Sequence, residues 1–432
     1  MFNPVIIAVL LMTVLCLLKV NVLIAIMISG IAGGVIGGLG FTGTINTLIG
    51  GMGGNAETAL SYILLGTLAV AISRTKIVEF VAQNISKLIK NKRALFVFII
   101  TGIGCFSQNL IPVHIAYIPI LIPPLLGLMN AMKLDRRAMA CGLTFSVKWP
   151  YVALPVGFGL IFHGIIADAM VQNGVQMSRA EVWKGMLLPS LGMILGLFVA
   201  VLFSYRKPRE YKTTHDYAPP DFATKIKFTR VEWGSLVAVA IAFVVQILTN
   251  SLPLGGLAGI LVLMATGAIK FNEVDETMVE GIRLMGFVAF VMLVAAGFAE
   301  VIKATGGVGQ LVEGSVKIIG GNKIIGALIM LLIGLGVTMG IGTSFGTVPI
   351  LATIYVPLGV QLGFSPLAIA SLIGTAGALG DAGSPASDST LGPTAGLNVD
   401  GQHDHIWDTC VPTFLHYNIP LIIFGTIAAM VL

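Results

Sequence analysis

Charged residues are scarce in this chain of 432 residues. Asp, Glu, Lys and Arg make up 10% of the sequence, whereas an average soluble protein carries about 25%. Hydrophobic residues account for 56%, so we expect most of the chain to lie in lipid rather than in water. The net charge of +5 is small and concentrated in loops, which argues against nucleic-acid binding.

Several motifs are also missing. The four cysteines are scattered and form neither a disulfide framework nor a zinc-binding spacing. No nucleotide-binding P-loop occurs, which excludes ATP-driven pumping by this chain alone. No Thr-Val-Gly-Tyr-Gly selectivity filter occurs, which disfavours a channel. The 53 glycines are not accompanied by polar low-complexity tracts, so they indicate closely packed and locally unwound helices rather than disorder.

The chain contains two sets of seven apolar segments. Several are shorter than the roughly 20 residues that cross a bilayer, so we expect some half-helices or re-entrant hairpins. An odd number per set inverts the second set relative to the first. The sequence therefore predicts an all-α polytopic membrane protein of two inverted repeats with paired re-entrant hairpins and broken helices. The segments lie near 5–18, 20–40, 57–73, 94–106, 112–128, 138–167 and 186–204, and near 233–250, 254–269, 284–300, 324–340, 349–363, 366–392 and 413–431.

A basic loop separates the two sets and predicts the orientation of the chain. Seven Lys and Arg residues lie in 205–232, and the positive-inside rule places them in the cytoplasm. We therefore divide the chain into a first transmembrane repeat (1–204), a cytoplasmic linker (205–232) and a second, inverted repeat (233–432). The first segment lacks a preceding basic region, so we interpret it as a retained helix rather than a cleaved signal. The expected location is the cell (inner) membrane.

Each repeat interrupts its apolar segments twice with Gly, Pro and polar residues. The breaks lie at 104–112 and 146–150 in the first repeat and at 342–349 and 380–385 in the second. Hydrocarbon cannot satisfy the backbone groups that unwinding frees, so such breaks persist only where they line a polar cavity. Paired breaks in corresponding halves are typical of secondary transporters.

The most polar break carries two carboxylates, Asp381 and Asp388. Carboxylates at membrane depth are costly and usually handle ions or protons. Hydroxyls and freed carbonyls beside them are hard oxygen ligands that suit sodium. The alternative for Asp388 is a capping role for a helix that begins at Ser389. We predict a sodium or proton site, with no cofactor and no other metal, made of Asp381, Ser384, Ser387, Asp388, Ser389 and Thr390.

Polar residues in the other breaks are candidates for substrate binding. Lys148 is suited to neutralise a substrate carboxylate or to stand in for a cation during part of the cycle; otherwise it is a snorkelling lysine. His114 either relays protons or packs. The residues at the two hairpin tips, 107–109 in the first repeat and 343–347 in the second, are expected to meet near the membrane midplane. They either bind a ligand there or form hydrogen bonds between helices. The candidates are Ser107, Gln108, Asn109, His114, Ser146, Lys148, Thr343, Ser344 and Thr347.

One stretch resembles a known family. The run Gly-Ser-Pro-Ala-Ser-Asp-Ser-Thr at 383–390, followed by Asp404-His405-Ile406 and by Pro412, is similar to the signature of the NhaC-type sodium/proton antiporter family. Ser389 stands where that pattern has Thr, which keeps the hydroxyl. The resemblance implies a transport domain that moves like an elevator against a scaffold, in a homodimer. Relatives in the wider superfamily include carriers of amino acids and small carboxylates.

The predicted function is ion-coupled secondary active transport without enzymatic activity. Sodium/proton antiport and sodium- or proton-coupled transport of an amino acid are equally compatible with the residues. A small-carboxylate carrier, a channel, and an intramembrane aspartyl protease prompted by Gly380-Asp381 are the alternatives. The expected partners are the lipid bilayer and a small-molecule or ion substrate.

Overall fold

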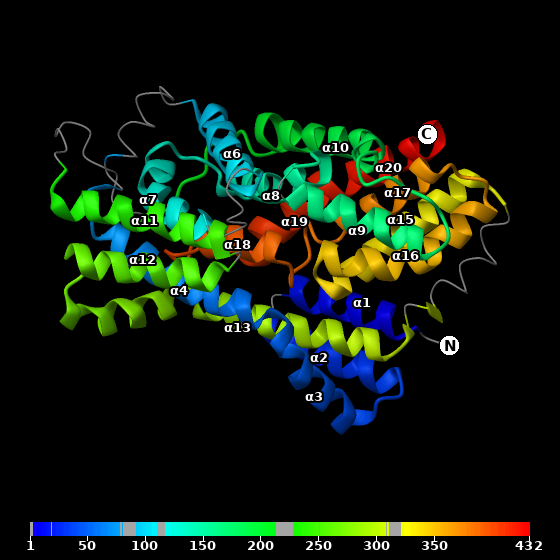
Figure 1. Cartoon of the computed structure of the whole chain (residues 1–432), viewed down its shortest axis with the longest axis horizontal. Coiled ribbons are helices and arrows are strands. Elements are labelled where there is room, and N and C mark those ends of the chain that lie inside the picture. Colours follow the sequence, from blue (N-terminus) through cyan, green and yellow to red (C-terminus); the bar gives the residue numbers. More distant parts are fainter. Residues whose placement is uncertain are drawn as a thin grey trace.

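The structure of this chain is a computed structural model that describes residues 3–18, 20–77, 80, 92–109, 117–156, 158–212, 228–249, 251–307, 309–310 and 321–432. Every regular element within these ranges is a helix (Figure 1). Four of the described helices are long and apolar enough to cross a membrane, and up to seven spans result if each bent helix pair counts as one. The predicted all-α membrane fold with broken helices is confirmed.

The helices that precede the linker match the predicted apolar segments, with one addition. Helix α3 was not predicted, because its Gly and Thr content lowers its hydropathy below that of its neighbours. The elements are α1 (Pro4–Leu17), α2 (Val22–Ile36), α3 (Gly40–Gly51), η1 (Met52–Asn55), α4 (Ala56–Ser73), α6 (Arg93–Asn109), α7 (Tyr117–Ala131), α8 (Arg136–Ala153), α9 (Phe158–Gln172), α10 (Val182–Val199) and the π-helical η3 (Ala200–Ser204).

The helices that follow the linker end in one long irregular span. Two stretches of π-helix, η6 and η7, interrupt this last span. The elements are α11 (Arg230–Thr249), α12 (Leu252–Thr266), η5 (Phe271–Glu273), α13 (Val274–Ala304), α15 (Lys323–Ile341), α16 (Ser344–Gln361), α17 (Pro366–Ala378), α18 (Asp388–Leu397), η6 (His405–Cys410), α19 (Val411–Thr413), η7 (Phe414–Asn418) and α20 (Ile419–Val431).

The helices form two groups (Figure 1). In the first group α13 packs along α4, with α2 and α3 near one end and the α11–α12 hairpin against α4. The second group contains α6 to α10 and α15 to α20, and its broken helices hold the polar residues predicted to bind ions. Helices α1 and α13 pack against α15, and α4 packs against α7, so these contacts join the two groups.

Helices at equivalent places in the two predicted repeats pack against one another. Helix α4 contacts α13, and α10 contacts α20. The other pairs are crossed: α7 contacts α18, and α16 contacts α9. Crossed contacts of this kind are what two repeats related by a twofold axis produce.

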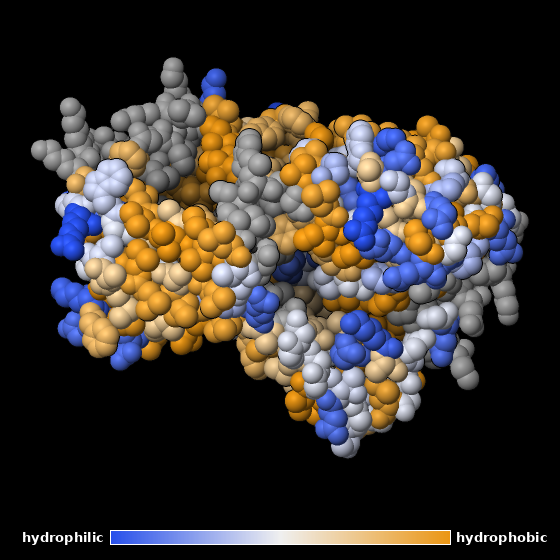
Figure 2. Space-filling model, viewed as in Figure 1, coloured by the Kyte–Doolittle hydropathy of each residue, from blue (hydrophilic) through white to orange (hydrophobic). Residues whose placement is uncertain are grey.

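The surface matches a lipid environment. Figure 2 shows a continuous apolar surface over the α11–α12 hairpin at the left of the view, with hydrophilic residues at its left tip and over parts of the right half of the molecule. Leu248 and Leu261 on these helices are 77% and 54% exposed. Large side chains of this kind in contact with water would be costly, so we interpret this surface as lipid-facing.

Two of the four predicted breaks differ from the prediction. Helix α8 runs unbroken through 146–150, and the break comes after Ala153, where α8 and α9 meet at 51°. Pro150 is tolerated because it lies in the last turn of α8, where one missing hydrogen bond disrupts little of the helix. Helix α6 continues to Asn109, so the first break does not begin at 104, and 110–116 lie outside the described residues. The breaks of the second repeat are present at 342–343 and 379–387, but the first is shorter than the predicted 342–349, because α16 begins at Ser344 and contains Pro349.

Candidate ion-binding site

Helix α8 carries Lys148 into the interior of the second helix group. The helix begins at a proper cap, because the Asp135 side chain accepts a hydrogen bond from the Arg137 N–H. From Ala138 to Ala153, only Trp149 is not buried. The Lys148 side chain is 1% exposed. A snorkelling role is therefore wrong, since the ammonium group does not reach a polar surface.

The broken α17–α18 pair carries Asp381. Helix α17 ends at Ala378 because Leu379 is extended and Gly380 has a φ of +77°, a conformation that favours glycine. Gly383 has a φ of +121°, and a Cβ there would lie 2.8 Å from the Phe414 Cα. The second half-helix, α18, begins at Asp388 with Ser387 as its cap. The sequence thus forces an unwound stretch of nine residues, 379–387, between two half-helices.

Helix α16 begins beside this unwound stretch. Gly342 adopts the left-handed conformation at the end of α15, Thr343 is extended, and Ser344 is the first residue of α16. Ser344 is buried at this helix start. Ser344 at the start of α16 and Ser387 at the start of α18 both contact the Asp381 carboxylate, so the two helix N-termini lie next to it.

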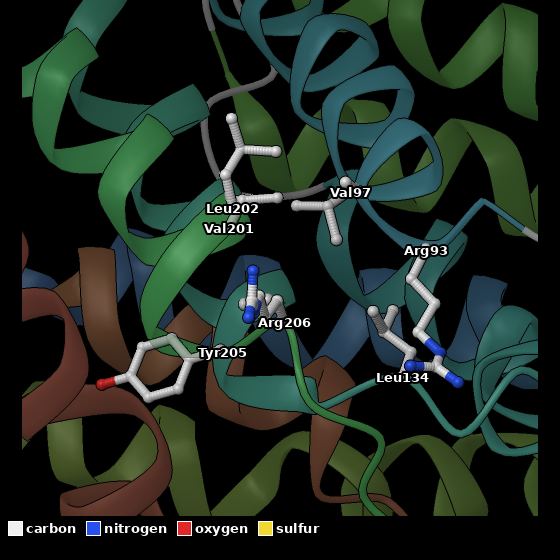
Figure 3. Close-up of a pocket in the computed structure, with 9 residues that line it drawn as sticks. Arg93, Val97, Leu134, Val201, Leu202, Tyr205 and Arg206 are labelled. Atoms are coloured by element: carbon white, nitrogen blue, oxygen red, sulfur yellow. The ribbon is translucent and has the colours of Figure 1, made fainter.

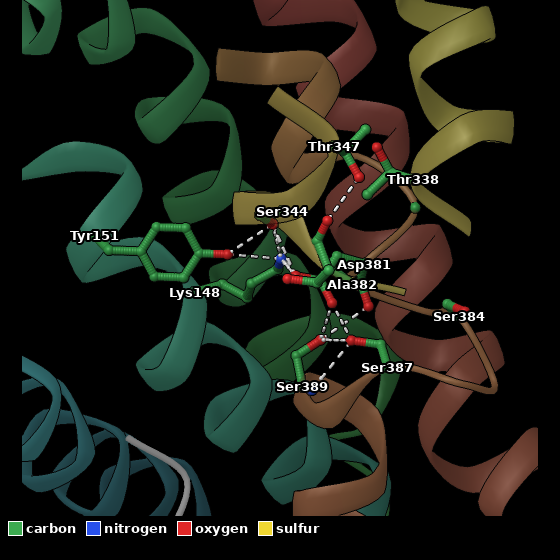
Figure 4. Close-up of polar contacts among 12 residues, drawn as sticks. Lys148, Tyr151, Thr338, Ser344, Thr347, Asp381, Ala382, Ser384, Ser387 and Ser389 are labelled. Atoms are coloured by element: carbon green, nitrogen blue, oxygen red, sulfur yellow. Dashed lines mark hydrogen bonds and ion pairs between the residues drawn. The ribbon is translucent and has the colours of Figure 1, made fainter. Parts of the chain in front are cut away.

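Lys148 and Asp381 form a buried ion pair that joins the two repeats (Figure 4). The Asp381 side chain is 5% exposed. The Lys148 ammonium donates to Asp381 Oδ2, to the Tyr151 hydroxyl at 2.7 Å and to Ser344 Oγ at 2.8 Å. These contacts satisfy all three of its N–H donors.

Hydroxyls complete the surroundings of Asp381. Ser344 Oγ donates to Oδ2 at 2.8 Å, and Ser387 Oγ donates to Oδ1. Ser389 Oγ donates to the Asp381 backbone carbonyl at 2.8 Å and lies 3.0 Å from Ser387 Oγ. Ser344, Ser387 and Ser389 all belong to the N-terminal ends of half-helices, where the helix dipole favours negative charge. Asp381 is thus held by one cation, three hydroxyl groups and two helix N-termini.

Asn418 holds the unwound backbone on both sides of Asp381. Its Oδ1 accepts from the Gly380 N–H at 3.0 Å, and its Nδ2 donates to the Ala382 carbonyl at 2.8 Å. Asn418 is fully buried at the end of the π-helical η7. These bonds replace the intrahelical partners that unwinding removed, each of which would otherwise cost about 1 to 3 kcal/mol. The sequence analysis missed Asn418 because it lies inside an apolar segment; a polar amide at that depth was the available signal.

Other predicted residues of this break are structural. Thr390 Oγ1 donates to the Ser384 carbonyl at 2.5 Å, and Ser384 Oγ donates to the Met339 carbonyl at 3.3 Å. Thr144 of α8 donates to the Ser389 carbonyl at 2.8 Å. His405, part of the family signature, lies 3.0 Å through Nε2 from the Pro385 carbonyl. These bonds fix the shape of the 379–387 stretch, and none of them contacts the carboxylate.

The capping alternative for Asp388 is wrong. Ser387 is the cap, because its side chain accepts from the Ser389 N–H at 3.2 Å, and Asp388 is the first residue inside α18. Asp388 is half-buried. A carboxylate in the first turn also stabilises α18 through the helix dipole.

The predicted substrate residues are only partly brought together. Ser344 and Lys148 contact Asp381, whereas Ser146 Oγ donates to the Leu143 carbonyl at 2.6 Å within α8. Thr347 Oγ1 donates to the Thr343 carbonyl at 2.6 Å within α16. His114 and the side chains of Ser107, Gln108 and Asn109 lie outside the described residues. In the second tip, Ser344 contacts Asp381 whereas Thr343 is exposed, and the predicted meeting of the two tips stays a prediction.

A second buried ion pair lies at the predicted cytoplasmic end of α8. Arg136 donates to both carboxylate oxygens of Asp400, at 2.7 and 2.6 Å, and both side chains are fully buried. The ring of Tyr211, from the linker, stacks on the Arg136 guanidinium at 4.2 Å. Burial acts to raise the pKa of Asp400, but the hydrogen bonds from Arg136 outweigh it and leave this pKa below its usual value. Burial also lowers the pKa of the neighbouring His403 to about 3.

The fold and this site define a secondary transporter of the ion-coupled class, with broken helices that meet at a buried carboxylate. A sequence profile of the Na+/H+ antiporter family matches residues 142–426, and a second Na+-H+ antiporter family profile matches residues 3–89. The chain belongs to the Na+/H+ antiporter family.

Relatives from several bacteria match over the whole of this chain. An uncharacterized membrane protein of Vibrio parahaemolyticus is 50% identical, with 100% of each chain covered. The proposed amino acid transporter YuiF of Bacillus subtilis is 48% identical, again with 100% of each chain covered. Among solved structures, the Neisseria gonorrhoeae efflux pump MtrF is 16% identical with a TM-score of 0.44, covering 91% of this chain and 85% of its own.

Proposed function

We propose that this chain carries a cation across the bacterial inner membrane by binding it at Asp381, and that Lys148 occupies the carboxylate when the cation is absent. The observation that carries the proposal is the buried Lys148–Asp381 pair at the junction of three broken helices. Sodium/proton exchange is the activity that this pair supports best.

A buried ion pair is a poor way to stabilise a fold. The desolvation of both charges offsets most of their attraction, and an apolar pair of similar volume is often as stable. A role in transport explains its presence better. An internal ammonium allows the empty carrier to bury Asp381 without a transported ion, and such burial is required if the site is to cross the membrane unloaded.

The surrounding oxygens suit sodium. The Asp381 carboxylate and carbonyl and the hydroxyls of Ser387 and Ser389 are hard oxygen donors already close together. A sodium ion among them displaces the Lys148 ammonium, which keeps Tyr151 and Ser344 as partners. If Lys148 then loses its proton, one sodium ion enters as one proton leaves, and the charge of the site is unchanged.

Amino acid transport is the second candidate. The full-length similarity to YuiF favours it, as does the chemistry of an opened Lys148–Asp381 pair. A zwitterion presents a carboxylate for Lys148 and an ammonium for Asp381, whereas a simple carboxylate matches Lys148 alone. Both candidates place Asp381 and Lys148 at the centre of the cycle.

The remaining parts of the proposal follow the family resemblance. The helix group α6 to α10 with α15 to α20 moves against the group built on α4 and α13, in a homodimer. Sodium or the proton is the coupling ion, and neither a cofactor nor an enzymatic activity is involved. Asp381 pairs with a lysine and not with a second catalytic aspartate, which counts against the protease alternative.

The test uses purified protein in proteoliposomes that contain a pH-sensitive dye. An imposed sodium gradient drives proton movement in the wild type, measured with and without a panel of amino acids. Asp381→Asn is expected to abolish this movement, because the amide keeps the volume and loses the charge. Asp168→Asn is the matched control, since Asp168 forms an exposed ion pair with Arg179.

Each outcome has a distinct meaning. Sodium-driven proton movement without amino acid identifies the antiporter, and movement that requires an amino acid identifies the second candidate. Full activity of Asp381→Asn would refute the proposed site in either case.

A further inference from the structure

A cavity of about 270 Å³ lies between the start of α6 and the end of η3 (Figure 3). Its inner wall is aliphatic, and its polar rim is formed by Arg93, Tyr205 and Arg206 (Figure 3). The aliphatic residues of the wall are Ala94, Val97, Leu134, Ala138, Val201 and Leu202. It lies apart from the Asp381 site and plays no role in the proposed exchange.

The rim is positively charged. None of the described residues that line the cavity is acidic. Arg93 donates through Nε to the Met132 carbonyl at 2.7 Å, which fixes its side chain and, within the described part of the chain, leaves its terminal nitrogens available. Arg93 and Ala94, the first two residues of α6, both line the cavity, so the N-terminus of this helix lies at its edge. Two guanidinium groups and a helix N-terminus together favour an anion.

The cavity lies at the level where the lipid-facing surface ends. Phe203 is 69% exposed and Leu202 38% exposed, and the residues that follow along the chain include Tyr205, Arg206 and Lys207. Tyrosine and arginine after an apolar helix mark the head-group level of a bilayer. By the charge rule this is the cytoplasmic side, where the anionic lipids of the membrane attract basic residues.

We propose that this cavity binds an anionic phospholipid. The lipid phosphate lies between Arg93, Arg206 and the α6 N-terminus, and the beginning of one acyl chain lies against Ala94 and Leu202, the wall residues that are not fully buried. An occupant of this kind matches both the charged rim and the aliphatic wall. A soluble phosphate ion matches the rim alone.

The test measures lipid binding to purified, delipidated protein by native mass spectrometry. Phosphatidylglycerol and phosphatidylcholine are titrated separately, and inorganic phosphate is added as a competitor. Arg206→Gln removes one rim charge from an exposed position and is expected to weaken phosphatidylglycerol binding about fivefold. Ala94→Phe fills the cavity and is expected to remove the bound lipid. Lys207→Gln is the matched control, since Lys207 is exposed beside Arg206 and does not line the cavity.

The expected result is a wild-type preference for phosphatidylglycerol that Arg206→Gln and Ala94→Phe reduce and Lys207→Gln leaves within about twofold. Equal loss in Arg206→Gln and Lys207→Gln would overturn the proposal, because it would reflect general surface charge. Displacement of the lipid by an equal concentration of inorganic phosphate would also overturn it and identify a soluble-anion site.

Discussion

Removing the two charges of the central ion pair, singly and together, separates its structural role from its role in transport. In Lys148→Met or Asp381→Asn one buried charge loses its partner, since the wild-type side chains are only 1% and 5% exposed. Breaking a buried pair in this way costs about 3 to 5 kcal/mol. Such a loss lowers the folding equilibrium constant by a factor of about 150 to 5,000.

The double variant Lys148→Met with Asp381→Asn removes both charges and is expected to recover most of that loss. Methionine keeps the length of the lysine stem, and the amide that replaces the Asp381 carboxylate still bonds to the hydroxyls of Ser344 and Ser387. The coupling free energy between the two substitutions is therefore expected to exceed about 2 kcal/mol. Transport, in contrast, is expected to be absent in the double variant, because no carboxylate remains to bind the cation.

Denaturant titration in detergent micelles measures the stability, and the proteoliposome assay measures transport. The exposed Arg179–Asp168 pair is the control, for which a coupling below about 1 kcal/mol is expected. Additive effects of the two substitutions would show that Lys148 and Asp381 do not depend on each other. Sodium-driven transport in the double variant would refute the role given to both.

Three other predictions concern the Asn418 hydrogen bonds, the burial of His403 and the topology of the chain. Asn418→Ala removes two hydrogen bonds from the unwound backbone and is expected to lower the unfolding free energy by about 2 to 5 kcal/mol in the same titration. Asn418→Asp keeps the acceptor for Gly380 but turns a buried carboxylate toward the Ala382 carbonyl, so it is expected to lose at least as much; unchanged stability in both variants would show that these bonds are dispensable. His403 has a pKa of about 3 in the folded chain and about 6.5 when unfolded, so stability falls as the pH drops from about 6.5 toward 3, by about 2 kcal/mol at pH 5; His403→Gln is expected to flatten this part of the stability profile, and an unchanged profile would contradict the burial of the ring. Cysteines placed at Lys207 and at Gln172 of a cysteine-free variant are expected to react with impermeant maleimide from opposite sides of the membrane, and labelling from one side would contradict the predicted topology.

The sequence predicted the second-repeat break well because its residues leave little choice. Gly380 and Gly383 adopt backbone conformations that favour glycine, and Pro385 follows them. The first-repeat break at 146–150 was wrong because one proline in the last turn does not stop a helix. Glycine and proline content indicates that a helix is weakened at a given place. Packing against neighbouring helices determines where the helix ends.

The contact between Lys148 and Asp381 could not be predicted from the sequence pattern. Lys148 and Asp381 were assigned to a substrate site and an ion site, and the structure joins them in one. Their contact depends on the crossed packing of the two repeats, which spacing along the chain does not specify. The role of Asn418 could not be predicted for a related reason. Two π-helical stretches rotate the last span and turn this side chain toward the unwound stretch at 379–387. If 405–431 formed a regular α-helix, Asn418 would lie on another face of that helix.

The crossed packing of the two halves also bears on how the chain is made. Lys148 is inserted into the membrane while its partner, 233 residues further along the chain, has not yet been synthesised. At about 5 to 20 residues per second, the first half waits roughly 10 to 50 seconds with an unpaired ammonium among its helices. During that interval α8 has neither the hydroxyl of Ser344 nor the carboxylate of Asp381 as a partner. Until the helices around Asp381 are inserted, the hydroxyl of Tyr151, on the same helix, is the one partner within the described part of the chain that Lys148 already has.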